Sequence, residues 1–253
     1  GVLYGGFRTT IINLVAGAEA MGYALSHSDA VVILVNDKHL SIWDEARATH
    51  EIRAQVLIVG ADIIWPDGTQ KRPLALIDAQ DHALLMYTSG TTGRPKGVLH
   101  THASLLAGGW TTAIAHQLSP MDRGLCVLPI YHINGLCVTI MGPLIAGGSV
   151  VVCDKFSASR FWATCSAYDI TWFSVVPTII SHLLHGDIDP DAATKARIRF
   201  GRSASSALAI ETQSAFEARF GIPIIETMGL TETAAQILSN PLPPGLRKIG
   251  SPG

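Results

Sequence analysis

Short apolar runs rich in Val, Ile and Leu recur along the chain and alternate with stretches of helical pattern. The runs lack the apolar–polar alternation of half-exposed strands, so we expect strands covered on both faces. They predict strands at 31–35, 55–60, 84–88, 125–129, 149–153, 171–176 and 222–225, and helices at 19–27, 102–116, 134–146, 157–168, 178–185 and 207–220. Ser157 and Thr178 stand where a helix N-cap would be useful. The alternation predicts an α/β fold with layered sheets flanked by helices.

Composition narrows the possible classes of protein. Of the 253 residues, 48% are hydrophobic and 15% are charged, which indicates a globular chain with a large buried core. The net charge is −2 and no basic stripe is visible, which disfavours nucleic-acid binding. The long apolar run at 125–153 is interrupted by His132, Asn134, prolines and glycines. It therefore predicts a strand, a turn, a buried helix and a second strand rather than a membrane span.

The cysteines and the chain ends give two further expectations. Cys126, Cys137, Cys153 and Cys165 lie in apolar surroundings without a C-x-x-C pair, which favours buried free thiols and a reducing, cytoplasmic compartment. The chain begins in mid-pattern and ends in a segment rich in Pro and Gly, so we expect a piece of a longer enzyme, truncated at both ends. Apolar surface exposed at such ends would favour homo-oligomers.

The segment YTSGTTGRPKG directly follows a predicted strand and precedes a helical stretch. Its hydroxyl side chains are Thr88, Ser89, Thr91 and Thr92, its glycines are Gly90, Gly93 and Gly97, and its cations are Arg94 and Lys96. Consecutive backbone N–H groups in such a loop form an anion-binding concavity, and the cations suit a polyphosphate. A plain surface loop is the alternative. The ordinary P-loop is excluded, because its second glycine would fall on Pro95.

This segment resembles the signature phosphate loop of the adenylate-forming superfamily, which includes acyl-CoA synthetases, peptide-synthetase adenylation domains and luciferases. Further landmarks follow in the same order, so the resemblance covers nearly the whole chain. It implies that residues 1–253 are part of the AMP-binding N-terminal domain of such an enzyme, and that the C-terminal domain is absent.

The segment ETMGLTE resembles the adenine and magnesium motif of that superfamily. The resemblance implies that Glu226, Thr227 and Met228 lie at the nucleotide, with Met228 in place of the usual tyrosine. Thr231 would contact the α-phosphate, and Glu232 would hold Mg²⁺, a cation that takes oxygen ligands. Without the phosphate loop, Thr231 and Glu232 would read as an ordinary helix N-terminus.

Three other segments resemble family landmarks. Ser205 and Ser206 lie in a small-residue turn that the family places beside adenine, although a serine-rich helix cap reads similarly. His132 lies in a Pro-x-aromatic-His pattern, which implies a position near the acyl carboxylate; a core histidine is the alternative. The turn 176–178 would line the acyl pocket. Segments 157–162 and 239–243 look like those of small-acid CoA ligases, such as oxalate–CoA ligase-like enzymes.

The resemblance implies an acyl-CoA synthetase that uses ATP, Mg²⁺ and CoA to activate a plain organic or fatty acid. Catalytic roles would fall to His132, Thr231, Glu232 and Lys96, with the loop 88–96 on the β- and γ-phosphates. Because the family's C-terminal lysine is absent, we expect the 253-residue chain alone to bind nucleotide weakly and turn over very slowly. The alternatives are an amino-acid or aryl-acid adenylation domain that loads a carrier protein, and a nucleotide-binding domain without turnover.

Overall fold

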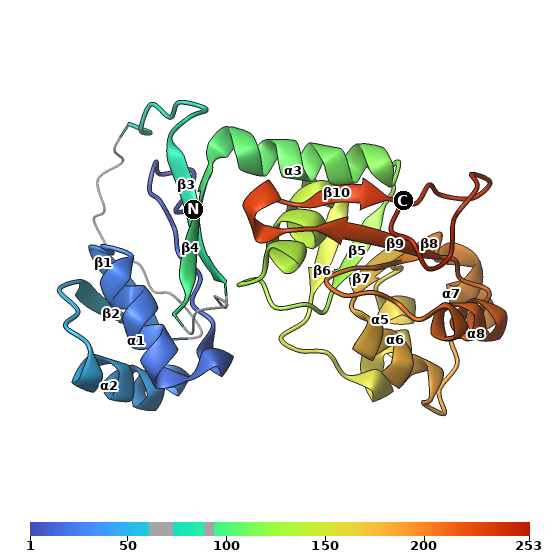
Figure 1. The fold of residues 1–253 in the computed structure, drawn as a ribbon, viewed down its shortest axis with the longest axis horizontal. Helices are drawn as coiled ribbons and strands as arrows, with labels where there is room; N and C mark the ends of the chain where they lie inside the picture. Colours follow the sequence, from blue (N-terminus) through green and yellow to red (C-terminus); the bar gives the residue numbers. More distant parts are fainter. Residues whose placement is uncertain (61–72, 89–93) are drawn as a thin grey trace. The chain divides into compact units, whose positions relative to one another are not determined.

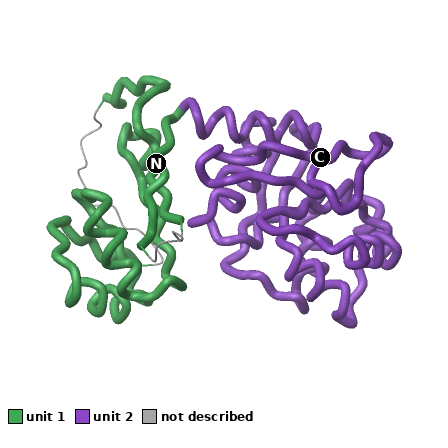
Figure 2. The backbone as a smooth tube through the Cα atoms, in the orientation of Figure 1, with its two compact units in different colours: residues 1–102 green, residues 103–253 purple. Residues whose placement is uncertain are grey.

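The chain folds into two compact units, residues 1–102 and 103–253 (Figures 1 and 2). The structure is a computed structural model and describes residues 1–60, 73–88 and 94–253. In these ranges unit 1 contains two two-stranded sheets and unit 2 one six-stranded sheet, and each unit has its own apolar core, so each is described by itself.

Unit 1 contains a parallel strand pair and an antiparallel hairpin. Its elements are the 3-10 helix η1 (Leu14–Ala16), α1 (Gly17–His27), β1 (Val32–Asn36), the 3-10 helix η2 (Asp37–His39), α2 (Leu40–Thr49), β2 (Gln55–Val59), β3 (His82–Thr88) and β4 (Lys96–Thr101). β1 and β2 are parallel, with Val32 opposite Gln55. Ile33 and Val35 pack against α1 and α2, whereas Leu34 is exposed.

The prediction that every strand is covered on both faces is therefore wrong for β1 and β2. Leu34 and Ile58 are 55% and 63% exposed. Because α1 and α2 both pack on one face of this pair, buried and exposed residues alternate along β1. The sequence does not show this alternation, since the exposed positions are also Val, Leu and Ile.

The hairpin of unit 1 holds both ends of the predicted phosphate loop. β3 and β4 are antiparallel, with Thr88 opposite Lys96. The helix predicted at 102–116 is confirmed as α3 (His102–Ala115), whereas the sequence predicts no strand between the loop and this helix, where β4 lies. The sequence of β4 does not indicate a strand, because it contains Gly97 and has polar residues at both ends. Its strand structure comes from hydrogen bonding to β3.

Unit 2 is a mixed sheet with helices on both faces. Its elements are α3, β5 (Arg123–Cys126), the π-helix η3 (Asn134–Met141), α4 (Gly142–Ile145), β6 (Ser149–Val152), α5 (Ala158–Ala167), β7 (Trp172–Val175), α6 (Pro177–Leu184), α7 (Ala192–Arg197), β8 (Phe200–Ser203), α8 (Ile210–Phe220), β9 (Ile224–Gly229), the 3-10 helix η4 (Thr231–Thr233) and β10 (Gln236–Ser239). The strand order is β10-β9-β8-β7-β5-β6, with β10 antiparallel and the others parallel.

Two apolar layers fix the faces of this sheet. α5, α6 and α8 cover one face through a cluster that includes Phe161, Ile180 and Phe216 (Figure 1). On the other face Trp172, Phe200, Ile225 and Leu242 form a second cluster. These two layers bury β7 and β8 completely. The sequence predicts a strand covered on both faces at β7, but it predicts no strand at β8.

The apolar run at 125–153 folds as the sequence predicts, into β5, a turn, the helical pair η3–α4 and β6. Among the described helices none combines the length and apolarity needed to cross a membrane. The four cysteines are free, as predicted, and burial raises the pKa of Cys126 to about 11 and those of Cys137 and Cys165 to about 12. Of the predicted caps, Ser157 has N-cap backbone geometry without a side-chain bond, and Thr178 lies inside α6, whose N-cap is Val176.

Asp122 ties the amino ends of the central strands together. It is 3% exposed, and it accepts hydrogen bonds from Arg199 at 2.6 Å, from Thr171 at 3.0 Å and from the backbone of Ser119 at 2.9 Å. Burial alone would raise the pKa of this carboxyl, but these hydrogen bonds outweigh burial and leave the pKa below its usual value.

We expect Asp122→Asn to lower the free energy of unfolding by about 1–3 kcal/mol at neutral pH, because Arg199 loses its charged partner. The stabilisation by the Asp122 carboxylate is fully present above the pKa that this group has in the unfolded chain. It is lost as pH falls through the lower pKa of the folded protein. Urea unfolding at several pH values checks it. Asp169→Asn, at a 67% exposed partner of Arg197, is the control and should change little. Equal effects of the two variants would contradict the assignment.

His116 is a fully buried imidazole between Phe200 and Trp172, with ring centroids 5.1 and 6.3 Å away. Burial, reinforced by the charge of Arg202, lowers its pKa to about 3. The ring is therefore neutral in the folded protein at pH values where an unfolded chain would protonate it.

We expect acid to destabilise unit 2 through His116. Between the unfolded pKa and the folded pKa, the unfolded chain binds one more proton, so stability falls by about 1.4 kcal/mol for each pH unit below about 6.5. His116→Phe, which suits the aromatic surroundings, should flatten this dependence between pH 6.5 and 5. His185→Gln at an exposed position is the control. Parallel pH profiles for wild type and His116→Phe would show that the expectation is wrong.

Candidate functional site

The carboxyl ends of the parallel strands bring the candidate residues of unit 2 to one edge of the sheet. Cys126 pairs with Ser174, Ser174 with Arg202, and Arg202 with Ile225, so β5, β7, β8 and β9 end side by side. β6 and β7 lie on opposite sides of β5, so the strand order reverses there. Ligands of open α/β sheets bind outside the carboxyl ends of strands at such a reversal.

His132 leaves this edge in the segment between β5 and η3. Its backbone N–H bonds Pro129 at 3.2 Å, and its ring lies 4.8 Å from that of Tyr131. The side chain is exposed, yet the atoms around it desolvate the ring and lower its pKa. A neutral, accessible imidazole at this place can donate or accept a hydrogen bond at neutral pH.

Ser205 and Ser206 leave the same edge, in the turn after β8, and both are exposed. Ser205 has a φ of 75°, a left-handed conformation that is uncommon for a residue other than glycine. Its hydroxyl accepts a hydrogen bond from Asn134 at 3.3 Å, and this contact joins the turn to the start of η3. A strained turn with small side chains permits the close approach of a flat ligand.

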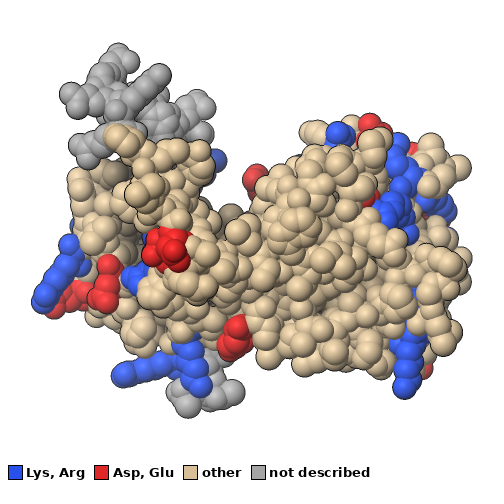
Figure 3. Space-filling model, turned by 90° about the horizontal axis from the view of Figure 1, so that it is seen from above, with Lys and Arg blue, Asp and Glu red and all other residues tan. Residues whose placement is uncertain are grey.

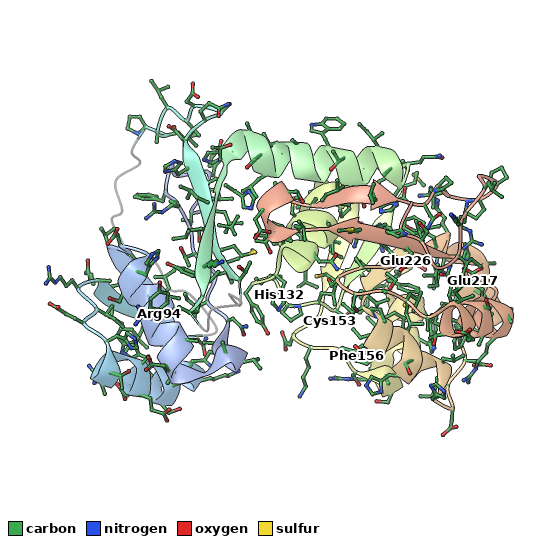
Figure 4. The ribbon with its side chains drawn as sticks, in the orientation of Figure 1. Arg94, His132, Cys153, Phe156, Glu217 and Glu226 are labelled. Atoms are coloured by element: carbon green, nitrogen blue, oxygen red, sulfur yellow. The ribbon has the colours of Figure 1, made fainter. Side chains whose placement is uncertain are left out.

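Glu226, which the resemblance places at the nucleotide, is buried on β9. It is 5% exposed, and its Oε1 accepts a hydrogen bond from the backbone of Leu208 at 3.1 Å. Figure 4 shows it well away from His132. The carboxylate of Glu226 therefore holds the end of the serine turn in place through the backbone N–H of Leu208. The motif resemblance cannot show this, because Leu208 lies 18 residues earlier in the chain.

Thr227 and Met228 follow on β9 toward its carboxyl end. The hydroxyl of Thr227 donates to the carbonyl of Ser203 at 3.3 Å, so it is buried in the sheet. Met228 is 44% exposed and pairs with Leu238 of β10. Of the two side chains, Met228 is the one that can contact a ligand at the surface.

Thr231 and Glu232 belong to η4, the single turn between β9 and β10, and Glu232 is exposed. The turn is tight because the backbone of Gly229 passes close to Ala235: a Cβ at Gly229 would lie 2.2 Å from the carbonyl oxygen of Ala235. An exposed carboxylate beside a threonine suits Mg²⁺ that shares its coordination with phosphate oxygens. The donor type at Glu232 thus fits the predicted metal.

The phosphate loop lies in unit 1. Its predicted residues Ser89, Gly90, Thr91, Thr92 and Gly93 lie outside the described residues. Its two described ends are Thr88 and Lys96, which face each other across β3 and β4, with the Thr88 hydroxyl 3.5 Å from the Lys96 carbonyl oxygen. Lys96 and Arg94 are exposed.

Sequence reasoning missed a buried polar group at the same edge of unit 2. Residues two apart on a strand lie on the same face of the sheet. On this face the core residues Trp172 of β7 and Phe200 of β8 are followed by the polar residues Ser174 and Arg202. Arg202 is 1% exposed and donates to Asn134. The sequence signal is a charged residue two positions after a core phenylalanine, in a segment too polar to be recognised as a strand.

Comparison with known proteins places this architecture in a family. A family model described as AMP-binding enzyme matches residues 1–253. The chain is 46% identical to a sulfoacetate–CoA ligase from Cupriavidus necator, over all of this chain and 50% of that protein. It is 32% identical to an oxalate–CoA ligase from Arabidopsis thaliana, over 96% of this chain and 49% of that protein. ATP-bound MatB from Rhodopseudomonas palustris matches 99% of this chain and 50% of its own, with a TM-score of 0.85 at 26% identity.

The chain belongs to the family of AMP-binding enzymes, and it has the fold that solved adenylate-forming enzymes use for half of their length. This confirms the resemblance drawn from the phosphate loop and the α/β fold predicted from the alternating runs. The chain spans about half the length of the curated relatives it matches.

The close approach at Gly229 generates an expectation about the η4 turn. Gly229→Ala places a methyl group against the Ala235 carbonyl, so β9 and β10 must move apart, at a cost of about 1–3 kcal/mol in the free energy of unfolding. Urea unfolding measures this. Gly221→Asn is the control, because Gly221 has a φ of 69° in open space and asparagine tolerates that conformation. If Gly221→Asn lowers the free energy of unfolding as much as Gly229→Ala does, the close contact at Gly229 is not the cause.

Proposed function

We propose that the protein activates a carboxylic acid with ATP to an acyl-adenylate and then transfers the acyl group to CoA. The observation that carries this proposal is the common edge at which β5, β7, β8 and β9 end, because the family's landmark residues in unit 2 follow these strands. The relatives named for sulfoacetate and oxalate support a short acid as the substrate.

In the first step, a carboxylate oxygen of the acid bonds to the α-phosphorus of ATP, and the bond from that phosphorus to pyrophosphate breaks. Both reactants are anions, so catalysis rests on positioning and on charge stabilisation. We assign Lys96 and the loop 88–96 to the β- and γ-phosphates. Lys96 is exposed at the end of β4, so its ammonium is free to reach a polyphosphate.

Thr231 and Glu232 take the α-phosphate and the metal in this proposal. Bound Mg²⁺ supplies positive charge that offsets the charge developing on pyrophosphate. Glu232 would hold that ion through an exposed carboxylate, and Thr231 would orient a phosphate oxygen from the same short turn. Met228 and the turn of Ser205 and Ser206 would enclose the adenine ring, braced by Glu226 through Leu208.

His132 would orient the carboxylate of the acid through its neutral ring, in keeping with its lowered pKa. In the second step, the sulfur of CoA bonds to the acyl carbon, the thiol gives up its proton, and AMP leaves with the electron pair of the broken acyl–oxygen bond. This sequence uses no nucleophile from the protein. A reducing, cytoplasmic setting is part of the proposal and is supported by the four free cysteines.

We expect the protein, at its natural full length, to release pyrophosphate from ATP and Mg²⁺ only in the presence of a suitable acid. Lys96→Ala and Glu232→Gln should each lower kcat/KM by about 100-fold or more, because each removes charge stabilisation of the transition state. Release is measured across a panel of short acids, fatty acids and amino acids, followed by CoA thioester formation.

Matched controls separate catalysis from stability. Lys195→Ala on α7 and Glu45→Gln on α2 remove charges of the same kind outside the candidate site and should keep wild-type rates. Release that prefers amino acids, with no CoA thioester, would favour the adenylation domain that loads a carrier protein. If the protein is folded and releases no pyrophosphate with any acid, the alternative of a nucleotide-binding domain without turnover would be favoured.

A further inference from the structure

Arg202 is a buried cation, and no carboxylate of the described residues forms an ion pair with it. Other arginines of unit 2 do form ion pairs with carboxylates: Arg197 with Asp169, Arg199 with Asp122, Arg219 with Asp189 and Arg247 with Glu217. Their side chains are 19–37% exposed, whereas Arg202 is 1% exposed. The most deeply buried of these cations is therefore the one for which the described residues supply no anion.

The hydrogen bonds of Arg202 come from one end of its guanidinium. Nη1 donates to Asn134 Oδ1 at 2.7 Å and to Ser174 Oγ at 3.1 Å. Nε is buried and has no hydrogen-bond partner among the described residues, and both side-chain hydrogen bonds of Arg202 to described residues come from Nη1. The Nε–Nη2 edge is the planar fork that matches the two oxygens of a carboxylate or sulfonate. Nη1 thus anchors the guanidinium of Arg202, and the Nε–Nη2 edge remains available to bind an anion.

No acid of the sheet offsets this charge from the other side. Glu226 lies next to the register partner of Arg202, on β9, but successive residues of a strand face opposite sides of a sheet. Its carboxylate accordingly bonds Leu208. Burial lowers the pKa of Arg202 to about 9, which leaves the guanidinium charged at neutral pH. An unpaired buried charge is strongly destabilising, so its presence calls for a partner that is not among the described residues.

The position of Arg202 relates this partner to the proposed site. Asn134 links Arg202 to the exposed Ser205 in the turn assigned to adenine, with its carboxamide bonded to both. Asn134 also follows two residues after His132, which is assigned to the acyl carboxylate. Arg202 is thus the buried end of a short polar chain that begins at the surface between these two assignments. It is too buried to belong to the exposed Lys and Arg side chains that gather at one end of unit 2 in Figure 3.

We propose that Arg202, anchored by Asn134 and Ser174, receives a second anionic group, a carboxylate or a sulfonate, on the acid that the enzyme activates. This inference rests on the proposed function. The reacting carboxylate lies at His132, and the far anion pairs with the Nε–Nη2 edge of Arg202. Arg202 is thereby the residue that selects short dianionic acids over monocarboxylic acids of the same length.

The test compares acids that differ in the second anion. Oxalate, malonate and sulfoacetate are measured against acetate and propionate, by pyrophosphate release from the full-length protein. Wild type should prefer the dianions, and Arg202→Met should lower kcat/KM for them by about 100-fold or more while changing that for acetate and propionate by less than about threefold. Arg202→Lys keeps the charge but loses the fork, so its loss should be intermediate.

A stability readout separates selection from a structural role. Arg202→Met removes an uncompensated buried charge, so its melting temperature without ligand should equal or exceed that of wild type. Malonate or sulfoacetate should raise the melting temperature of wild type but not that of Arg202→Met. Ser174→Ala removes one anchor of Nη1 and should weaken only the dianions, and Arg160→Met at an exposed site is the matched control.

The outcomes distinguish this inference from the proposed function. Equal losses for dianions and monocarboxylates in Arg202→Met, or a wild type that prefers monocarboxylates, would overturn the anion subsite and leave acid activation standing. If no acid supports pyrophosphate release, the proposed function fails. In that case a melting-temperature rise with malonate in wild type alone would still support the subsite, and its absence would overturn it.

Discussion

Parallel hydrogen bonding between β5, β7, β8 and β9 is the constraint on which the candidate site depends. The pairing of Ser174 with Cys126 on one side and with Arg202 on the other places the ends of separate chain segments at one edge. No single segment contains a site. The turn with His132, the turn with Ser205 and the turn with Glu232 acquire a common location only because the strands before them share a register.

The buried polar groups at the two edges of this sheet differ in their hydrogen bonding. At the amino edge Asp122 has several donors and an ion pair, so its polar atoms are satisfied within the protein. At the carboxyl edge, buried atoms of Arg202, Ser203 and Glu226 have no hydrogen-bond partner among the described residues, and neither does Nε1 of Trp172 at the amino edge. Groups of the first kind stabilise the fold, and the unsatisfied atom of Arg202 lies where we propose that a ligand binds.

Much of the fold can be predicted from the sequence, and the misses have physical causes. β7 and β6 are short β-rich apolar runs, so their composition alone identifies them. β8 reads Phe-Gly-Arg-Ser and owes its strand structure to pairing with β7 and β9, which a local pattern cannot show. The exposed Leu34 of β1 looks like a core residue in the sequence, because apolarity alone does not report which face a neighbouring helix covers.

The candidate site divides in the same way. His132, Ser205 and Glu232 stand in recognisable motifs, and they lie in the segments that follow β5, β8 and β9. Glu226 stands in a motif as well, yet its carboxylate bonds a backbone N–H of the serine turn. Arg202 lies beside the serine turn, but the motif assigns it no role, and its hydrogen bond to Asn134 joins residues 68 positions apart in the chain. Contacts between distant segments are the part of a site that the sequence does not display.

The buried cysteines have a consequence for the chemistry of the proposed reaction. An acyl-adenylate reacts with any thiolate it meets, and Cys126 ends the strand that leads toward His132. With its pKa raised to about 11, roughly one Cys126 thiol in ten thousand is ionised at pH 7, and Cys137 and Cys165 are ionised still more rarely. In the proposed reaction, burial would keep these three thiols from competing with the sulfur of CoA for the acyl group.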